Sequence, residues 1–144
     1  MNTKTRAEHL TIGKIGESIA QEYLRHKGYR IIAKNYRKPW GEIDLIAKSK
    51  DQTLVFFEIK TLRDRELSHP SIIPEDNLTN SKLKKLKKIC ESFANSNPQI
   101  INEKRGWQID LLTLLLKNPE NLNQPKLSLT EIEKYCEIKH YENI

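Results

Sequence analysis

The segment GEIDLIAKSKDQTLVFFEIK, from Gly41 to Lys60, has two apolar stretches around a polar middle. Four charged residues, Glu42, Asp44, Glu58 and Lys60, lie at its two ends. Its composition is typical of two buried β-strands joined by a polar turn, where an unpaired charge is costly to bury. If residues 49–53 form the loop, Asp44 lies opposite Glu58 and Glu42 lies opposite Lys60. Because side chains alternate along a strand, all four charges then share one face at one end of the hairpin.

This arrangement points to metal chemistry. Two carboxylates facing each other at roughly 5 Å repel, and each raises the pKa of the other unless a cation lies between them. Mg²⁺ takes oxygen ligands, often one or two carboxylates together with water and substrate phosphate, and Asp44 and Glu58 would supply those carboxylates. Lys60, about 6.6 Å further along the strand, would reach a phosphate or a water beside the metal. The alternative is a purely structural ion-pair network, with Glu42 bound to Lys60.

The sequence predicts one helix before the hairpin and one after it. Apolar residues recur at helical spacing from Arg6 to Lys27, with Gly28 as the stop, and again from Ser81 to Asn95. The other expectations are strands at 29–33 and 107–116, loops at 34–40, 62–80 and 118–125, and a tail at 126–144 that fits either a strand or a helix. This order predicts an α/β domain with a mixed β-sheet of four to five strands flanked by helices.

Composition narrows the classes of function. The 144 residues are 37% hydrophobic and 31% charged, which suits one domain spanning 1–144. No apolar run is long enough to span a bilayer and residues 1–14 lack a signal peptide's apolar core, so we expect a cytoplasmic protein without membrane contact. The two cysteines indicate neither a disulfide framework nor a thiolate metal site, and the four scattered histidines leave metal binding to carboxylates. A net charge of +6 favours nucleic acid as partner.

The hairpin also carries a resemblance. GEIDLI followed by FFEIKT resembles the metal-binding hairpin of PD-(D/E)XK nucleases, and in particular the YraN-like family of endonuclease-like proteins, which are similar in fold to Holliday-junction resolvases. The segments GKIGESIAQEYLRHKGYRIIAKNYR, SKLKKLKKI and IKHYENI extend the resemblance over nearly the whole chain. It implies a restriction-endonuclease-like fold and a nuclease that cleaves DNA, including branched or structured substrates, with Mg²⁺ or Mn²⁺.

The resemblance also implies the site residues. Asp44 and Glu58 would bind the metal with the backbone carbonyl of Ile59, and Lys60 would be the lysine of the E-x-K motif. Glu17 corresponds to an acid that resolvase-like members add from the first helix. The expected catalytic residues are therefore Glu17, Asp44, Glu58 and Lys60, and the expected metal ligands are Asp44, Glu58, Glu17 and Ile59.

Basic residues nearby are candidates for binding the nucleic acid. Five of the seven residues from Lys82 to Lys88 are lysines, of which Lys82 and Lys85 are the best candidates for phosphate contacts. Arg37 and Lys38 precede the acidic motif, beside Trp40, which we expect at a rim or in the core rather than stacked on a base.

Two positions depart from the family pattern. Leu62 and Gln108 stand where relatives usually carry arginine, so a phosphate contact would shift to Arg65. These departures bear on substrate affinity and activity, not on the metal ligands.

Two other functions stay open from the sequence. The chain would be a nucleic-acid-binding protein of nuclease fold without significant cleavage, or an adaptor for an acidic protein whose hairpin charges are merely paired. The sequence also does not decide between DNA and RNA, and it does not give the structure of the substrate. Whether the chain forms the homodimer that recognition of a two-fold junction would require is open as well.

Overall fold

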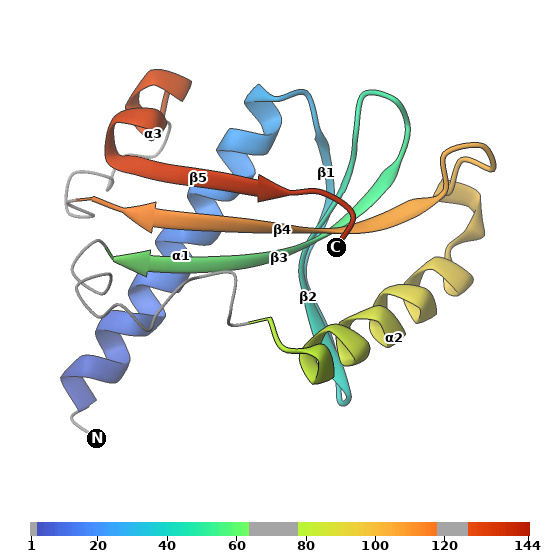
Figure 1. Cartoon of the computed structure of the whole chain (residues 1–144), viewed down its shortest axis with the longest axis horizontal. Helices are drawn as coiled ribbons and strands as arrows, with labels where there is room; N and C mark the ends of the chain where they lie inside the picture. The colour runs from blue at the N-terminus through green and yellow to red at the C-terminus, as the bar shows by residue number, and fades with distance from the viewer. Residues whose placement is uncertain (1–2, 64–77, 118–126) are drawn as a thin grey trace.

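The computed structural model describes residues 3–63, 78–117 and 127–144, with side chains described from Ile12 onward. A five-stranded sheet in the order β1-β2-β3-β4-β5 forms its centre, with β3 and β4 parallel and the other neighbours antiparallel (Figure 1). The elements are α1 (Thr3–His26), β1 (Arg30–Lys38), β2 (Gly41–Lys48), β3 (Leu54–Arg63), α2 (Asn80–Ser96), η3 (Pro98–Ile100), β4 (Trp107–Leu116), α3 (Leu129–Tyr135) and β5 (Cys136–Tyr141). This mixed α/β architecture confirms the predicted restriction-endonuclease-like fold class.

Helix α1 covers one face of the sheet. Its buried residues, among them Ile19 and Leu24, pack with Val55 and Phe57 of β3, as the alternation of side chains along a strand requires. The helix ends as predicted at Gly28, whose φ of 93° is the left-handed conformation that glycine adopts without strain.

Helix α2 covers the other face. The side chain of Thr79 caps it by accepting a hydrogen bond from the backbone N–H of Lys82. Ile89 and other buried residues of α2 pack with Leu54 and Phe56, the β3 residues that alternate with those facing α1. The predicted second helix is therefore confirmed, and both faces of β3 are apolar because each is covered by a helix.

The first strand is longer than predicted. The segment 34–38 was expected in a loop but belongs to β1, and only Pro39 and Trp40 form the turn to β2. Pairing with β2 continues to Lys38 opposite Gly41. The sequence signal is weak here because the residues in this part of β1 are mostly exposed, so they show no apolar alternation.

The C-terminal tail contains both elements that its pattern allowed. Helix α3 begins at the cap Ser128 and is followed directly by β5, which pairs with β4. The expected loops after Arg63 and after Lys117 lie mostly outside the described residues, as does Arg65. None of the described helices is both long and apolar enough to cross a membrane.

The sheet divides between β2 and β3. These strands pair only from Lys48 opposite Leu54 to Leu45 opposite Phe57, whereas β3 pairs with β4 from Leu54 to Arg63. Beyond Leu45, β2 follows β1 away from β3 (Figure 1). Ile43 therefore packs in the cluster under α2, and the prediction that it shares the apolar face of Leu45 is wrong.

A glycine lets α1 approach the sheet closely. A Cβ added to Gly16 would lie 1.9 Å from Oγ1 and 2.7 Å from Cβ of Thr61 on β3, whereas one added to Gly13 meets nothing within 4 Å. Contact with β3 thus accounts for Gly16 but not for Gly13.

Substitution of the two glycines should therefore have opposite effects. Gly16→Ala should lower the free energy of unfolding by about 1–3 kcal/mol, because the helix must move away from β3. Gly13→Ala, the matched control, should raise it by up to about 1 kcal/mol, because alanine favours the helix. Chemical denaturation measures both, and equal effects of the two substitutions would contradict the close contact.

Candidate active site

Asp44 lies where β2 parts from β3. Its carboxylate Oδ2 accepts a hydrogen bond of 2.8 Å from the backbone N–H of Ile59, where the β2–β3 ladder has ended. The register that pairs Leu45 with Phe57 places Asp44 opposite Glu58, as the sequence predicted. Because the N–H and C=O of one strand residue point to the same side, the carbonyl of Ile59 also faces this gap.

Asp44 and Glu58 interact directly across the gap. Burial raises the pKa of Asp44 to about 6, against the hydrogen bond from Ile59. Burial, followed by the charge of Asp44, raises the pKa of Glu58 to about 8. The side chains of the two acids lie within hydrogen-bonding reach of each other. A cation between two such carboxyl groups would relieve the repulsion that raises their pKa values.

Two more acids complete what we call the acidic cluster, namely Glu17, Glu42, Asp44 and Glu58. Burial, then the charge of Glu42, raises the pKa of Glu17, and Glu17 in turn contributes to the raised pKa of Asp44. Glu42 acts on the pKa of Glu58 as well. The structure therefore brings Glu17 of α1 to the hairpin, although α1 and β2 are distant in sequence.

Asn35 supports Glu17 and was missed by the sequence reasoning. Its side chain hydrogen-bonds the Glu17 carboxylate and favours the charged form. Asn35 has a φ of 51°, a left-handed conformation that asparagine adopts more readily than most residues. The asparagine was visible in the sequence, but its segment was expected to be a loop, so no direction could be assigned to its side chain.

Cations surround the acidic cluster from three elements. Lys60 of β3 and Lys82 of α2 both act to lower the pKa of Glu58. Lys82 is exposed in the first turn of α2, and its charge acts on Glu58 from there. Arg37 of β1 forms an ion pair with Glu42, with 3.3 Å from Nε to Oε1.

Two further residues, Lys85 and Lys38, were predicted to contact the nucleic acid. Lys85 is exposed on α2, and Lys38 at the end of β1 places its ammonium 5.5 Å from the ring centre of Tyr36. Within the described part of the chain, no three acids of the cluster have carboxylate oxygens within 4.8 Å of one another. The side chains of Asp44 and Glu58 contact each other, and Glu17 acts on Asp44 through its charge.

A second polar group lies in β4 and the C-terminal segment. Asp110 is fully buried and accepts hydrogen bonds from Gln108 (2.8 Å) and the backbone N–H of Asn143 (2.9 Å), and it contacts His140 Nε2 at 2.7 Å. The ionisable partner of Asp110 is therefore a histidine. Gln108, expected only as a missing arginine, has a structural role here.

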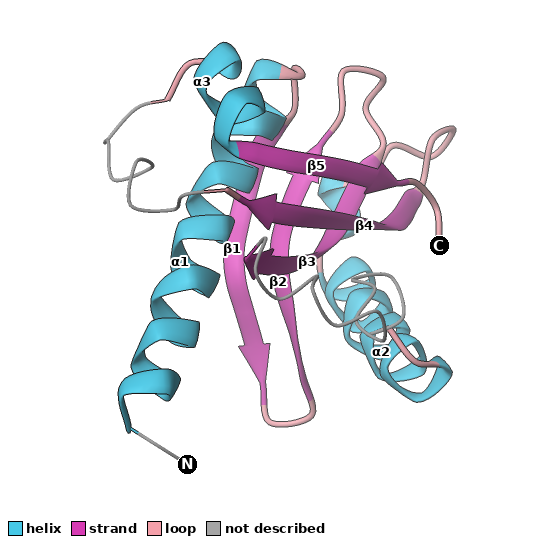
Figure 2. Cartoon of the chain, turned by 60° about the vertical axis from the view of Figure 1, so that its left-hand side comes forward, coloured by secondary structure: helices cyan, strands magenta, loops and turns pink. Residues whose placement is uncertain are grey.

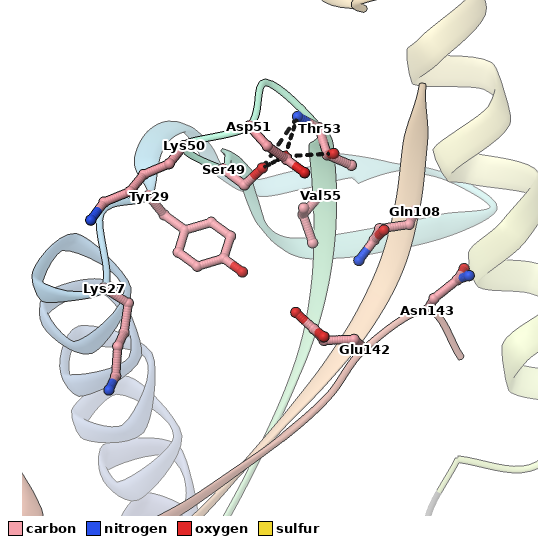
Figure 3. Close-up of a pocket in the computed structure, with 10 residues that line it drawn as sticks. All are labelled: Lys27, Tyr29, Ser49, Lys50, Asp51, Thr53, Val55, Gln108, Glu142 and Asn143. Atoms are coloured by element: carbon pink, nitrogen blue, oxygen red, sulfur yellow. Dashed lines mark hydrogen bonds between the residues drawn. The ribbon is translucent and has the colours of Figure 1, made fainter. Parts of the chain in front are cut away.

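Asp110 and His140, with Glu142, also place three donor atoms within 4.8 Å of one another. The sequence reasoning missed this group, because Asp110 is far along the chain from His140 and Glu142 and only β4–β5 pairing brings them together. Glu142 borders a pocket of about 480 Å³ (Figure 3), which contains none of the predicted site residues. The pocket is lined by Lys27, Tyr29, Ser49, Lys50, Asp51, Thr53, Val55, Gln108, Glu142 and Asn143.

The region of this chain that matches known proteins includes the acidic cluster. The model of the family described as "Uncharacterised protein family UPF0102" matches residues 16–114, a range that includes all four acids. A UPF0102 protein of Chloroherpeton thalassium is 34% identical over 119 residues, which cover 81% of this chain and 86% of the relative. One from Caldanaerobacter subterraneus is 36% identical over 119 residues, covering 82% and 89%.

The raised pKa of Glu58 has a consequence for stability. The folded protein keeps the Glu58 proton up to about pH 8, whereas the unfolded chain releases it near the ordinary value of 4.5. The folded state therefore binds more protons between these values, and this group makes the protein less stable as pH rises through them.

Glu58→Gln should remove that loss while keeping a donor to Asp44. Without divalent cations, the free energy of unfolding of the variant is compared with that of the native protein at each pH. The difference, variant minus native, should increase by more than about 1 kcal/mol between pH 5 and pH 8.5. Denaturant titrations at both pH values measure this gain, with Glu91→Gln on the exposed side of α2 as the control. A difference between Glu58→Gln and the native protein that is the same at both pH values would contradict the raised pKa.

Proposed function

We propose that this chain, which belongs to the uncharacterised protein family UPF0102, the YraN-like group of the PD-(D/E)XK type, hydrolyses phosphodiester bonds of DNA. The proposed reaction depends on a divalent metal, Mg²⁺ or Mn²⁺. The observation that carries the proposal is the half-buried carboxyl pair of Asp44 and Glu58, whose side chains meet at the point where two strands part.

The donor set suits a hard divalent cation. Asp44 and Glu58 offer carboxylate oxygens and Ile59 offers a carbonyl that faces the same gap. The charge of Glu17 also acts on Asp44, and Glu17 would bind the metal or one of its waters. Such an ion would relieve the repulsion between the carboxylates, and it would supply an activated water and charge neutralisation for the phosphate.

The chain's own residues would then orient the reactants. Lys60 is near Glu58, where its ammonium can hold the attacking water or a phosphate oxygen in place. Lys82 approaches Glu58 from α2, so it can bind a phosphate beside the one that is cleaved. Lys85, Arg37 and Lys38 are exposed and would contact the backbone further along. Arg65 remains a candidate on sequence grounds alone.

A binding protein without cleavage is the second candidate function. The small number of close carboxylates favours it, because no three acids of the cluster among the described residues have carboxylate oxygens within 4.8 Å of one another, and such a site holds a metal less tightly. Cleavage assays separate the two functions, since the basic residues would bind nucleic acid in either case.

Asp44→Asn tests the proposed hydrolysis. Asparagine keeps an oxygen acceptor for the Ile59 N–H but loses the charge that would bind the metal. We expect the native protein, given Mg²⁺ or Mn²⁺, to cut at least one member of a panel of labelled linear, nicked and branched DNAs. The variant should be slower by about 10²-fold or more while it binds the same DNA.

Glu137→Gln, an exposed acid on the far edge strand β5, is the control and should cut at the native rate. Equal cutting by Asp44→Asn and the native protein would show that the activity does not come from this site. Tight, salt-sensitive binding by a native protein that cuts no substrate with either metal would favour the second candidate function.

A further inference from the structure

A tryptophan is exposed at the turn between β1 and β2. Trp40 keeps 57% of its surface accessible and is the one large hydrophobic residue exposed among the described side chains. Tryptophan is normally among the more buried residue types, and the chain's other one, Trp107, packs edge-on against Phe56 at 5.4 Å. The ring of Trp40 therefore contributes little to the core and is available to a partner.

The turn holds this ring on a firm support. Pro39 and Trp40 alone connect the paired residues Lys38 and Gly41, so the loop has little freedom. Gly41 faces α2, where an added Cβ would lie 3.5 Å from the side chain of Ile89. The closed end of the hairpin projects from the rest of the sheet (Figure 2). Because the turn already fixes the flat ring, stacking a partner on it costs little conformational entropy.

The charges around the ring favour a polyanion. Lys38 and Arg37 precede the turn and are both exposed, and α2, which packs behind the turn, carries Lys82 and Lys85. A flat aromatic ring beside cations matches a nucleic-acid strand, because bases stack on the ring while phosphates bind the cations. A base can do this only where it is unpaired or at the end of a duplex.

The spacing to the acidic cluster connects the ring to the cleavage site. Trp40 precedes Asp44 by four residues on β2, or about 13 Å at the rise of a strand. That length equals about four nucleotides of a stacked strand at 3.4 Å each. A strand whose phosphate lies at Asp44 would therefore reach the ring.

We infer that Trp40 stacks on an unpaired base about four nucleotides from the phosphate at the acidic cluster, so that the substrate class is DNA with a single-stranded segment. This inference deepens the proposed function and rests on it for the position of the cleaved strand. The stacking itself requires no metal and no cleavage.

Binding in EDTA tests the inference separately from hydrolysis. The probes are a single-stranded oligonucleotide of thymidines and a blunt duplex of equal length. Trp40→Ala should weaken single-strand binding at least about fivefold and leave duplex binding within twofold. Trp40→Phe should retain part of the affinity. In a Trp107→Phe background, where Trp40 is the sole tryptophan, the single strand should quench the fluorescence.

Equal affinities of Trp40→Ala and the native protein for the single strand, or fluorescence that the oligonucleotide leaves unchanged, would overturn the inference. A blue shift on anionic vesicles without quenching by the oligonucleotide would also overturn it, in favour of a membrane surface. Stacking by a protein that cuts nothing would overturn only the hydrolysis, and cutting without any effect of Trp40→Ala would overturn only the stacking.

Discussion

The separation of β2 from β3 beyond Leu45 is the constraint on which the site depends. It leaves the N–H of Ile59 without a ladder partner, and the Asp44 carboxylate takes that hydrogen bond instead. An acidic side chain thus replaces a backbone acceptor at a half-buried position, next to a second acid on β3. A continuous ladder would close the gap and leave no space for a cation between the two carboxyl groups.

Helices α1 and α2 each bring a charged side chain to that gap. The close approach of α1 at Gly16 brings Glu17 one residue further along the helix to the acidic cluster, while α2 brings Lys82 to Glu58 from the other face. Burial keeps the dielectric low, which strengthens both the repulsion between the acids and their attraction to cations. Acids that raise one another's pKa values, with cations close by, are typical of a functional site.

Much of this could be predicted from the sequence, because local patterns specify it. The alternation of apolar residues identified the hairpin, and the length of its loop set Asp44 opposite Glu58. The direction of Asn35 and the exposure of Trp40 could not be predicted, because a polar edge strand lacks the periodic signal that distinguishes it from a loop. The contact of Asp110 with His140 also depends on strand pairing between distant segments, which no spacing reveals.

A crystal structure with Mn²⁺, using the anomalous signal of the ion, tests the central proposal most directly. We expect an anomalous peak between the carboxylates of Asp44 and Glu58, within coordination distance of the Ile59 carbonyl and absent in crystals of Asp44→Asn. Density with no ion at this position, or an ion bound only by Asp110, His140 and Glu142, would contradict the proposal that the divided sheet holds the metal.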